Sequence, residues 1–460
     1  MRQHTSDCFL ILHQHLCPFG QVIYVLSILC KFAIRLQICI KMGDFSFFSI
    51  FIWRCVFFYV NLQSNFKFAQ IMDKSKYIER SISAVVLEAA QYFPVVCITG
   101  PRQSGKSTLI KHLFPNFIKY TLEDLDVRNY AKSDPVAFLN QTEEGMILDE
   151  VHKVPELLSY IQGIADDHPN RQFILSGSSN FALIRSVSQS LAGRVGMFDL
   201  LPMSMEETQK DTERKSLDEL MFDGLYPSIC AEKNIARLYY PSYVKTYLER
   251  DVREVVNVKD LIQFNTFLRL CAGRIGSVFN ASELASEVGV TSNTISSWLS
   301  VLEASYVITL LHPYSGNTVK RLIKSPKLYF CDTGLACYLL NIESPVQLSR
   351  DKMRGHLFEN LIVMEALKAR FNKGKESNLY FYRDSNKNEI DLLTKDGNCM
   401  NGFEIKSSMT YNIDFQKVIS KMDTYIKDPI GKRAIVYAGN MENTNADIQL
   451  VNYKQASKLF

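Results

Sequence analysis

Short apolar runs alternate with helix-spaced segments from residue 72 to about residue 200. Apolar runs of this length, bounded by polar residues, predict strands. The runs are Val95–Thr99, Phe117–Thr121, Met146–Asp149, Phe173–Ser176 and Val195–Leu200. Segments 127–139 and 154–165 between them have the spacing of amphipathic helices. The pattern predicts an α/β fold in which a parallel sheet has helices on both faces and its ligand lies at the carboxyl ends of the strands.

The pattern changes to helical over residues 206–272 and then to that of a winged helix-turn-helix over 278–330. Short helices are expected at 281–288 and 292–303, with Gly289 in the turn and Thr291 as the cap of the second helix. Apolar runs at 306–311 and 328–330 could form the wing strands.

The end of the chain returns to strand-like alternation. Residues 388–393 and 402–406 predict two strands, and the Lys-Asp-Gly-Asn sequence at 395–398 predicts the turn of a hairpin between them. The chain therefore divides into an α/β domain at 72–205, a helical linker with a winged-helix-like region at 206–345, and a second α/β domain at 346–460. Its length of 460 residues suits about three domains.

The first 71 residues differ in composition, being rich in Phe, Ile and Cys. Their apolar stretches are interrupted by Lys31, Arg35, Lys41 and Arg54, so none reaches the roughly 18 uncharged residues of a membrane span. We interpret residues 1–71 as a mispredicted or unstructured extension, with translation beginning at Met72; a degenerate membrane anchor is the alternative. The six cysteines after Met72 are scattered singly, which favours buried free thiols in the cytoplasm and no membrane partner.

A phosphate-binding motif follows the first strand. The sequence from Gly100 to Ser107 fits the pattern GxxxxGK[ST], whose backbone N–H groups surround a phosphate where a helix begins. Lys106 would neutralise the β- and γ-phosphates, and the Ser107 hydroxyl would bind Mg²⁺. The residues expected to contact ATP here are Gly100, Pro101, Arg102, Gln103, Ser104, Gly105, Lys106, Ser107 and Thr108.

The third strand ends in two carboxylates, Asp149 and Glu150. Asp149 at the strand tip is expected to hold Mg²⁺ against Ser107, and Glu150 to orient or deprotonate the attacking water.

Two further groups could belong to the site. Ser178 and Asn180 follow the fourth strand and could sense the γ-phosphate, although turn chemistry explains them equally well. Arg194 precedes the fifth strand and could stabilise transferring phosphoryl oxygens, or form a surface salt bridge.

Together these segments carry a family resemblance. The series GPRQSGKST, LEDLD, ILDEVHKVPEL, LSGSSN and SLAGRVGMFDLLPMSMEE resembles bacterial and archaeal AAA-type ATPases that pair a P-loop NTPase domain with a C-terminal domain of unknown function. The later series YVKTYLERDV, FCDTGLACYLL, GHLFENLIVME, FYRDSNKNEIDLL and FEIKSS is similar to that second domain. The resemblance implies an ATP and Mg²⁺ site at Lys106, Ser107, Asp149 and Glu150, with Arg194 as a sensor or finger, and leaves a homo-oligomer open.

A second constellation lies in the predicted C-terminal hairpin. Asp391 and Glu404 can share a metal ion there, and Lys406 lies on the same face of its strand as Glu404. Glu359, on a preceding helix, could add a carboxylate. The arrangement resembles the PD-(D/E)xK nuclease core, in which carboxylates bind Mg²⁺ and a lysine steadies the nucleophilic water. An E-x-K triplet is also frequent on exposed strands, so nuclease activity stays open.

The charge distribution along the chain bears on whether its partner is DNA or a protein. The net charge of +4 gives no global basic field, and between Arg274 and Lys320 there is no Lys or Arg beside three glutamates. The winged-helix-like region therefore favours protein docking over DNA, with DNA binding left open. We expect an ATP-binding AAA-type protein whose Mg²⁺-dependent ATP hydrolysis drives or gates a C-terminal DNA- or protein-interacting module. The alternatives are an ATP-gated, metal-dependent DNA nuclease and a nonenzymatic, nucleotide-switched docking or DNA-binding protein.

Overall fold

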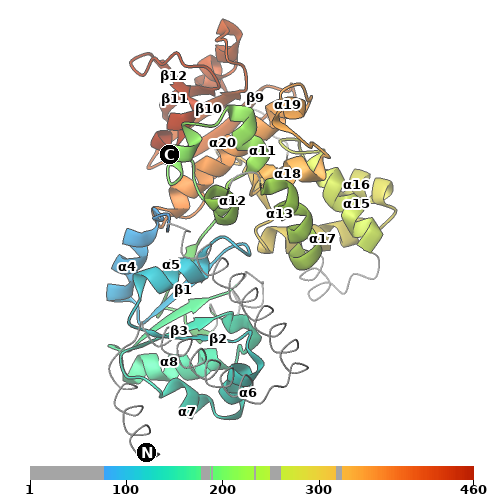
Figure 1. The fold of residues 1–460 in the computed structure, drawn as a ribbon. Coiled ribbons are helices and arrows are strands. Elements are labelled where there is room, and N and C mark those ends of the chain that lie inside the picture. Colours follow the sequence, from blue (N-terminus) through green and yellow to red (C-terminus); the bar gives the residue numbers. More distant parts are fainter. Residues whose placement is uncertain (1–76, 178–186, 188–189, 233–234, 249–260, 317–323) are drawn as a thin grey trace, which may run out of the picture. The chain divides into compact units, whose positions relative to one another are not determined.

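The alternation between residues 95 and 199 produces a five-stranded parallel sheet (Figure 1). A computed structural model describes residues 77–177, 187, 190–232, 235–248, 261–316 and 324–460. The strands are β1 (Val95–Thr99), β2 (Ile118–Thr121), β3 (Gly145–Asp149), β4 (Gln172–Ser176) and β5 (Val195–Asp199). Their order is β2-β3-β4-β1-β5, and every neighbouring pair is parallel. The predicted fold class is confirmed, with strand ends within one residue of those expected.

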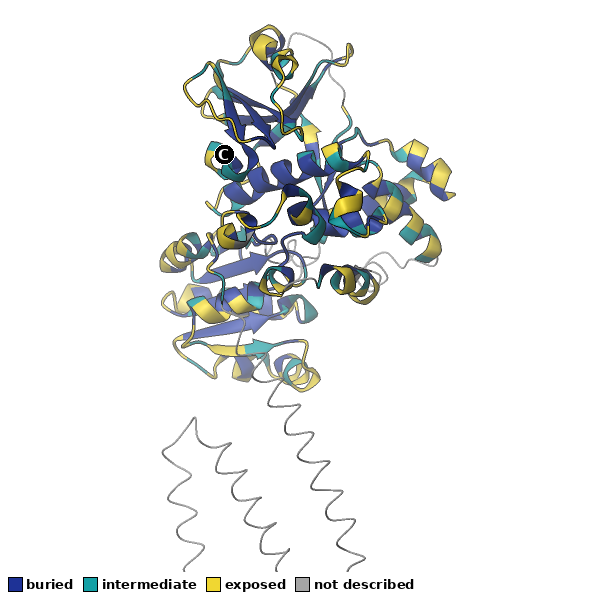
Figure 2. Cartoon of the chain, turned by 45° about the horizontal axis from the view of Figure 1, so that its top comes forward, coloured by how far each residue is buried: buried dark blue, intermediate teal, exposed yellow. Residues whose placement is uncertain are grey.

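Helices cover both faces of this sheet because successive strand residues point to opposite sides. Val96 and Ile98 pack against α4 (Ser83–Tyr92) and α5 (Lys106–Leu113). Val95 and Cys97 belong to the core on the other face, which the remaining helices cover. These helices are α6 (Leu125–Ser133), α7 (Pro135–Leu139) and α8 (Leu157–Asp167). The strands β1, β3 and β4 are buried, whereas β2 at one edge is not, and Figure 2 shows buried strands between helices whose outer sides are exposed.

A mainly helical region follows the first sheet. Its elements are α10 (Gln209–Thr212), α11 (Leu217–Asp223), α12 (Pro227–Ala231), α13 (Ala236–Tyr243), the π-helical turn Val244–Leu248, α15 (Leu261–Ala272), α16 (Ala281–Val288), α17 (Ser292–Ala304), α18 (Thr333–Leu339) and α19 (Pro345–Leu348). Asn280 caps α16, Gly289 ends it with a φ of 78°, and Thr291 caps α17. Local capping signals thus fixed both helices where the sequence predicted them.

The second sheet has seven strands. They are β6 (Ile308–Pro313), β7 (Lys327–Phe330), β8 (Leu379–Arg383), β9 (Glu389–Asp396), β10 (Cys399–Lys406), β11 (Ile430–Tyr437) and β12 (Ile448–Asn452), in the order β12-β11-β10-β9-β8-β6-β7. β9 and β10 form the expected antiparallel hairpin, but both strands are longer than predicted and the turn is shorter, since Asp396 already pairs with Cys399. The helix α20 (Arg354–Phe371) packs against β10 and β7, and the short α21 (Met422–Tyr425) precedes β11.

The second sheet crosses the domain boundary that the sequence predicted at residue 345. β6 belongs to the preceding region, yet His312 and Pro313 pair in parallel with Tyr380 and Phe381 of β8. One hydrophobic core contains residues from both sides of that boundary, including Trp298, Phe330 and Phe358. The helical region and the C-terminal strands therefore fold around a shared core.

Buried cysteines and helix lengths bear on two further predictions. Of the six cysteines after Met72, Cys97, Cys271, Cys331 and Cys337 are buried free thiols, as the sequence predicted, whereas Cys230 and Cys399 are only partly buried. Burial raises the pKa of Cys97 and of Cys331 to about 12. Such thiols stay protonated and inert.

Within the described ranges, the longest apolar helices are too short or too polar to cross a bilayer.

Candidate nucleotide site and C-terminal carboxylate cluster

The loop between β1 and α5 has a backbone that requires glycine at both ends. Gly100 has a φ of 144°, and a Cβ atom there would lie 2.2 Å from the carbonyl oxygen of Leu200. Gly105 has a φ of 94° and forms the N-cap of α5. These two positions let the chain turn sharply from the end of β1 into the start of a helix, where backbone N–H groups converge.

Buried basic side chains stabilise this loop from inside and outside. The Lys106 Nζ atom donates to the carbonyl oxygens of Gly100 and Pro101 at 2.9 and 2.8 Å, so its ammonium lies over the loop. Arg80 approaches from the other side and donates to the Ser104 carbonyl at 2.8 Å. Its guanidinium also contacts Glu207 at 3.0 Å. Hydrogen bonds from Lys106 and Arg80 therefore hold the loop in this conformation without a ligand.

Asp149 lies where the sequence placed it, at the carboxyl end of β3. Ser107 Oγ donates to Asp149 Oδ2 at 2.6 Å, and Ser176 Oγ donates to Oδ1 at 2.5 Å. The Lys119 ammonium of β2 lies 2.9 Å from Oδ2. Burial alone would raise the pKa of Asp149, but the hydrogen bonds from Ser107 and Ser176 and the Lys119 charge outweigh it, so the pKa lies below its ordinary value. The side chain is a carboxylate, and with Ser107 it forms the oxygen pair that Mg²⁺ prefers.

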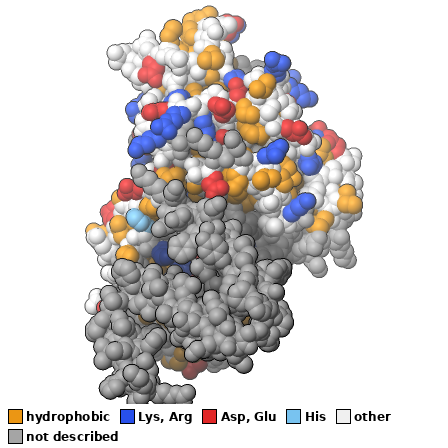
Figure 3. All heavy atoms as spheres, viewed as in Figure 1, with side chains coloured by type: hydrophobic (Ala, Val, Ile, Leu, Met, Phe, Trp, Pro, Cys, Tyr) orange, Lys and Arg blue, Asp and Glu red, His pale blue; other side chains and the backbone are white. Residues whose placement is uncertain are grey.

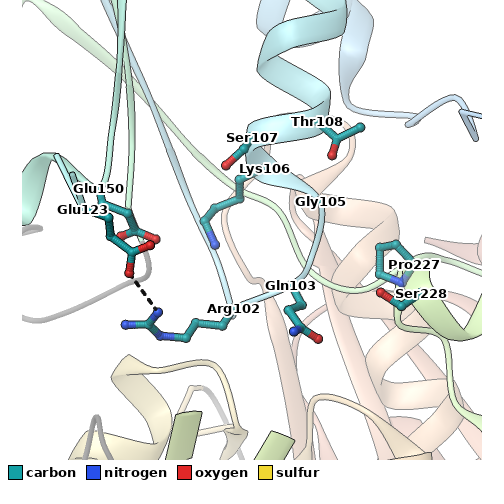
Figure 4. Close-up of a pocket in the computed structure, with 10 residues that line it drawn as sticks. All are labelled: Arg102, Gln103, Gly105, Lys106, Ser107, Thr108, Glu123, Glu150, Pro227 and Ser228. Atoms are coloured by element: carbon teal, nitrogen blue, oxygen red, sulfur yellow. Dashed lines mark ion pairs between the residues drawn. The ribbon is translucent and has the colours of Figure 1, made fainter. Parts of the chain in front are cut away.

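Glu150 follows in a left-handed backbone conformation, with a φ of 56°. Its Oε2 atom lies 3.1 Å from Nδ1 of His152. A left-handed conformation is uncommon for glutamate and occurs mainly where surrounding structure imposes it. The turn directs the Glu150 side chain into the pocket beside the phosphate-binding loop (Figure 4).

That pocket has a volume of about 580 Å³, within the range of small-molecule sites. Figure 4 shows Lys106 between Glu123 and Glu150 on one side and Gln103 on the other, with Arg102 paired to Glu123. The lining residues are Arg102, Gln103, Gly105, Lys106, Ser107, Thr108, Glu123, Glu150, Pro227 and Ser228. The structure thus brings the loop, Ser107 and Glu150 together as predicted.

Arg194 is a predicted site residue that lies away from the pocket. It precedes β5, and its carbonyl accepts a hydrogen bond from the N–H of Val95 at the start of β1. The phosphate-binding loop follows the opposite end of β1, a five-residue strand away. The Arg194 Nε atom instead lies 2.5 Å from Asp166 Oδ1. Arg194 therefore lies away from the pocket of its own chain, and the surface salt bridge is the arrangement observed. Ser178 and Asn180 lie outside the described residues.

Several site residues carried no sequence signal strong enough to single them out. Ser176 ends β4 beside β3, and its position at the strand tip could have favoured it over Ser178. Glu123 stands in the LEDLD series but was not assigned a role. Pro227 and Ser228 begin α12, far along the chain, and only the folded structure places them beside Gly105, with Pro227 Cγ 3.6 Å from where its Cβ would be.

The C-terminal carboxylates also come together. Lys406 Nζ lies 2.9 Å from Asp391 Oδ2 and 2.6 Å from Glu404 Oε2, and the Ile405 N–H donates to the same Asp391 oxygen at 2.8 Å. Glu359 of α20 takes part through a different lysine, Lys327 of β7, whose Nζ lies 2.9 Å from Glu359 Oε1. Asp391, Glu404 and Lys406 are thus in contact, whereas Glu359 contacts Lys327, a residue that the sequence reasoning missed.

The pKa values of Glu404 and Asp391 are shifted in opposite directions. Burial raises the pKa of Glu404 well above its ordinary value, and the nearby Asp391 charge adds to the effect. For Asp391, burial is outweighed by attraction to Lys406 and Lys327, and its pKa is lowered. Glu404 Oε1 is buried and has no hydrogen-bond partner among the described residues. Over the same residues, no group of three His, Cys, Asp or Glu side chains has metal-binding geometry.

Comparison with known proteins divides the chain into three matched regions. An AAA domain matches residues 92–209, a domain of unknown function (DUF8612) matches 214–346, and a second domain of unknown function (DUF4143) matches 354–456. Among solved structures, a Walker-type ATPase of Pyrococcus abyssi shares 15% identity with a TM-score of 0.42, covering 57% of this chain and 96% of that one. A STAND protein of Pyrococcus horikoshii shares 13% identity with a TM-score of 0.23, covering 66% and 50%.

Relatives align over most of the chain. Uncharacterized proteins of Mycobacterium bovis and Mycobacterium tuberculosis are each 30% identical over 368 residues, which cover 79% of this chain and 80% of theirs. An uncharacterized protein of Methanocaldococcus jannaschii is 25% identical over 357 residues, covering 70% and 76%. The chain therefore belongs to the family of these mycobacterial proteins, and its residues 92–209 match an AAA domain.

Proposed function

We propose that the chain hydrolyses ATP with Mg²⁺ at the edge formed by β1 and β3. The observation that carries this proposal is one pocket lined by Lys106, Ser107 and Glu150, with Asp149 accepting a hydrogen bond from Ser107. Ser107 and Asp149 would hold the ion, whose charge would offset that of the phosphates. Lys106 would bind the β- and γ-phosphates, and Glu150 would accept a proton from the attacking water.

The test is ATP turnover by the full chain, measured as phosphate release with and without Mg²⁺ and with and without DNA. We expect turnover that requires Mg²⁺. ATP binding without turnover under all of these conditions would favour the alternative of a nonenzymatic, nucleotide-switched docking protein.

Lys119 offers a sharper test of the Mg²⁺ position, since its ammonium contacts the same oxygen of Asp149 as Ser107 does. The Lys119 side chain is 32% exposed, so its ion pair is worth at most about 1 kcal/mol. Lys119→Met should therefore strengthen Mg²⁺-dependent ATP binding roughly two- to five-fold, by removing a competing cation. The matched control is Lys111→Met, at an exposed lysine of α5. Weaker binding in Lys119→Met would mean that Lys119 contacts the phosphates instead.

Conformational changes at the nucleotide would reach the C-terminal region through the segment after β5. Arg80, which holds the loop at Ser104, also donates to the Leu201 carbonyl at 2.8 Å. The Met205 N–H donates to Glu365 Oε2 of α20 at 2.8 Å, and Lys368 Nζ of the same helix donates to the Met203 carbonyl at 2.8 Å. These buried contacts support the proposal that ATP hydrolysis drives or gates the C-terminal module, because α20 also carries Glu359.

A second contact joins the sheet edge to the helical region. Tyr306, between α17 and β6, donates to Asp199 Oδ1 at the end of β5. Thr99, the residue before the phosphate-binding loop, donates to the same oxygen at 2.5 Å. A shift of the loop would therefore be transmitted to the winged-helix-like region as well as to α20.

The partner of that region is proposed to be a protein, with DNA as the alternative. Arg274 is engaged by Glu287, with Nη2 2.5 Å from Oε1, and α16 and α17 carry no Lys or Arg. On the face shown in Figure 3, basic side chains of the described residues are interspersed with acidic and apolar ones. Phosphate contacts supply much of DNA affinity, so this face offers little for it. Lys320 and Arg321 of the predicted wing lie outside the described residues.

For the C-terminal domain we propose a nuclease-like fold whose Asp391 and Glu404 can bind a divalent ion. The order α20-β8-β9-β10, with both carboxylates and Lys406 on the hairpin, supports it. The Lys406 ammonium now contacts both carboxylates and would have to move for an ion to bind. An ATP-gated DNA nuclease is the corresponding alternative function, which metal-dependent DNA cleavage would favour.

Metal binding at this site is testable by thermal stability. In a Lys106→Ala background, which weakens the nucleotide site, Mn²⁺ at a hundredfold excess over its Kd should stabilise the fold by about 2.7 kcal/mol. Asp391→Asn should erase the increase in Tm, because the amide is a poor ligand. Lys406→Met should retain it. An increase that survives Asp391→Asn would place the ion elsewhere.

A further inference from the structure

The carboxylate cluster of the C-terminal domain contains a lysine supplied by the preceding region. Lys327, at the start of β7, is fully buried, with a side-chain exposure of 0%. Its Nζ atom lies 2.9 Å from Glu359 Oε1 and 2.5 Å from Glu389 Oε1. The Phe381 ring lies on another side, with its centroid 5.4 Å from Nζ. Two carboxylates from α20 and β9 thus converge on one ammonium in a closed space.

The surroundings of Glu359 are built to hold it in place. The Tyr329 hydroxyl donates to Glu359 Oε1 at 2.6 Å. Gly276, whose N–H donates to the Leu328 carbonyl at 2.9 Å, closes the other side, since a Cβ atom there would lie 3.2 Å from Glu359 Oε2. His356 Nδ1, at the same distance from that Cβ position, is buried without a hydrogen-bond partner among the described residues.

The cluster contains four carboxyl groups and three basic side chains. Its carboxylates are Glu359, Glu389, Asp391 and Glu404. Its cations are Lys327, Lys406 and Arg383, the last with Nη1 3.1 Å from Glu389 Oε2. Burial alone would lower the pKa of Lys327, but attraction to Glu359, Asp391 and Glu389 outweighs it, and Lys327 stays charged. Glu404, 4% exposed, still has its Oε1 atom unpartnered, so the cluster has acceptor capacity left.

We propose that the Lys327 ammonium occupies a divalent-cation position between Glu359 and Glu389, so that the cluster binds one metal ion fewer than its carboxylates could hold. A buried ammonium and a divalent metal ion are both stabilised by carboxylate oxygens that converge on them. The ammonium differs in that it cannot leave, because its chain is part of β7. This inference extends the metal site proposed for Asp391 and Glu404 and specifies its stoichiometry.

The test counts Mn²⁺ ions bound per full chain, from the EPR signal of free Mn²⁺, in the Lys106→Ala background. Lys327→Met should bind one ion more than its parent, and Glu359→Gln added to it should remove that ion. The matched control is Lys368→Met, which removes another buried lysine that pairs with a carboxylate of α20, Glu365 at 3.0 Å. That control should gain no ion, since only one carboxylate would be left unpaired.

The outcomes separate this inference from the metal site at Asp391 and Glu404. If the parent binds one ion and Lys327→Met binds two, both the role of Lys327 and the metal site at Asp391 and Glu404 are supported. A parent with none and Lys327→Met with one supports the role of Lys327 and contradicts the Asp391–Glu404 site. No gain in a folded Lys327→Met overturns the role of Lys327 in either case.

Folding failure is also informative, because unpaired buried carboxylates destabilise a fold. If Lys327→Met lacks a thermal transition in metal-free buffer, Mn²⁺ should restore it. No restoration, with the neutral pair Lys327→Met/Glu359→Gln folded, would overturn the proposal.

Discussion

Lys106→Ala is expected to abolish measurable ATP binding and to leave the fold intact. The ammonium lies over the loop at hydrogen-bond distance from Gly100 and Pro101, where it would meet the phosphates. A charge-assisted hydrogen bond contributes about 1.5–3 kcal/mol, so losing contacts to two phosphates should weaken binding about 100-fold or more. The measurement is the affinity for a fluorescent ATP analogue, together with the Tm.

Lys111→Ala is the matched control for this prediction. Lys111 lies on the same helix, α5, but its side chain is exposed and does not line the pocket. It should bind ATP as the parent does. Unchanged affinity in a folded Lys106→Ala protein would show that nucleotide binds somewhere other than this loop.

The first sheet could be predicted closely because its signals are local. The strands β1, β3 and β4 are short apolar runs closed by polar residues, and β1 leads directly into the loop that begins at Gly100. The caps of α16 and α17 are equally local, with Asn280 and Thr291 bonded to N–H groups a few residues away. Where structure depends on neighbours within a few residues, the sequence is sufficient to predict it.

The parts that the sequence did not predict depend on contacts between distant segments. Pro227 reaches the nucleotide pocket, and Lys327 reaches Glu359 and Glu389, only after the helical region has folded against both sheets. Arg194 was misplaced for a different reason. It precedes β5, and in a parallel sheet whose ligand lies at the carboxyl ends of the strands this position is at the opposite edge, so the expected topology already argued against its role in the site.

Glu150→Gln is expected to retain ATP binding and to lose turnover by about 10²- to 10⁴-fold, the contribution of a positioned general base. Glutamine has the shape of glutamate and meets the same backbone cost at a φ of 56°, so the turn should persist. What it lacks is the ability to accept a proton from water. The measurement is phosphate release in single turnover, with ATP affinity determined on the same protein.

Glu123→Gln is the control that makes this result specific to the position of the base. Glu123 lines the same pocket, but its carboxylate lies 3.8 Å from the Arg102 guanidinium, which would hold it as an ion pair. Glu123 stands two residues after β2, whereas Glu150 directly follows Asp149, the carboxylate that accepts a hydrogen bond from Ser107. Turnover should therefore fall far less than in Glu150→Gln. The reverse order, with Glu123→Gln inactive and Glu150→Gln active, would assign the base to Glu123 and leave Glu150 with its His152 contact as part of the turn after β3.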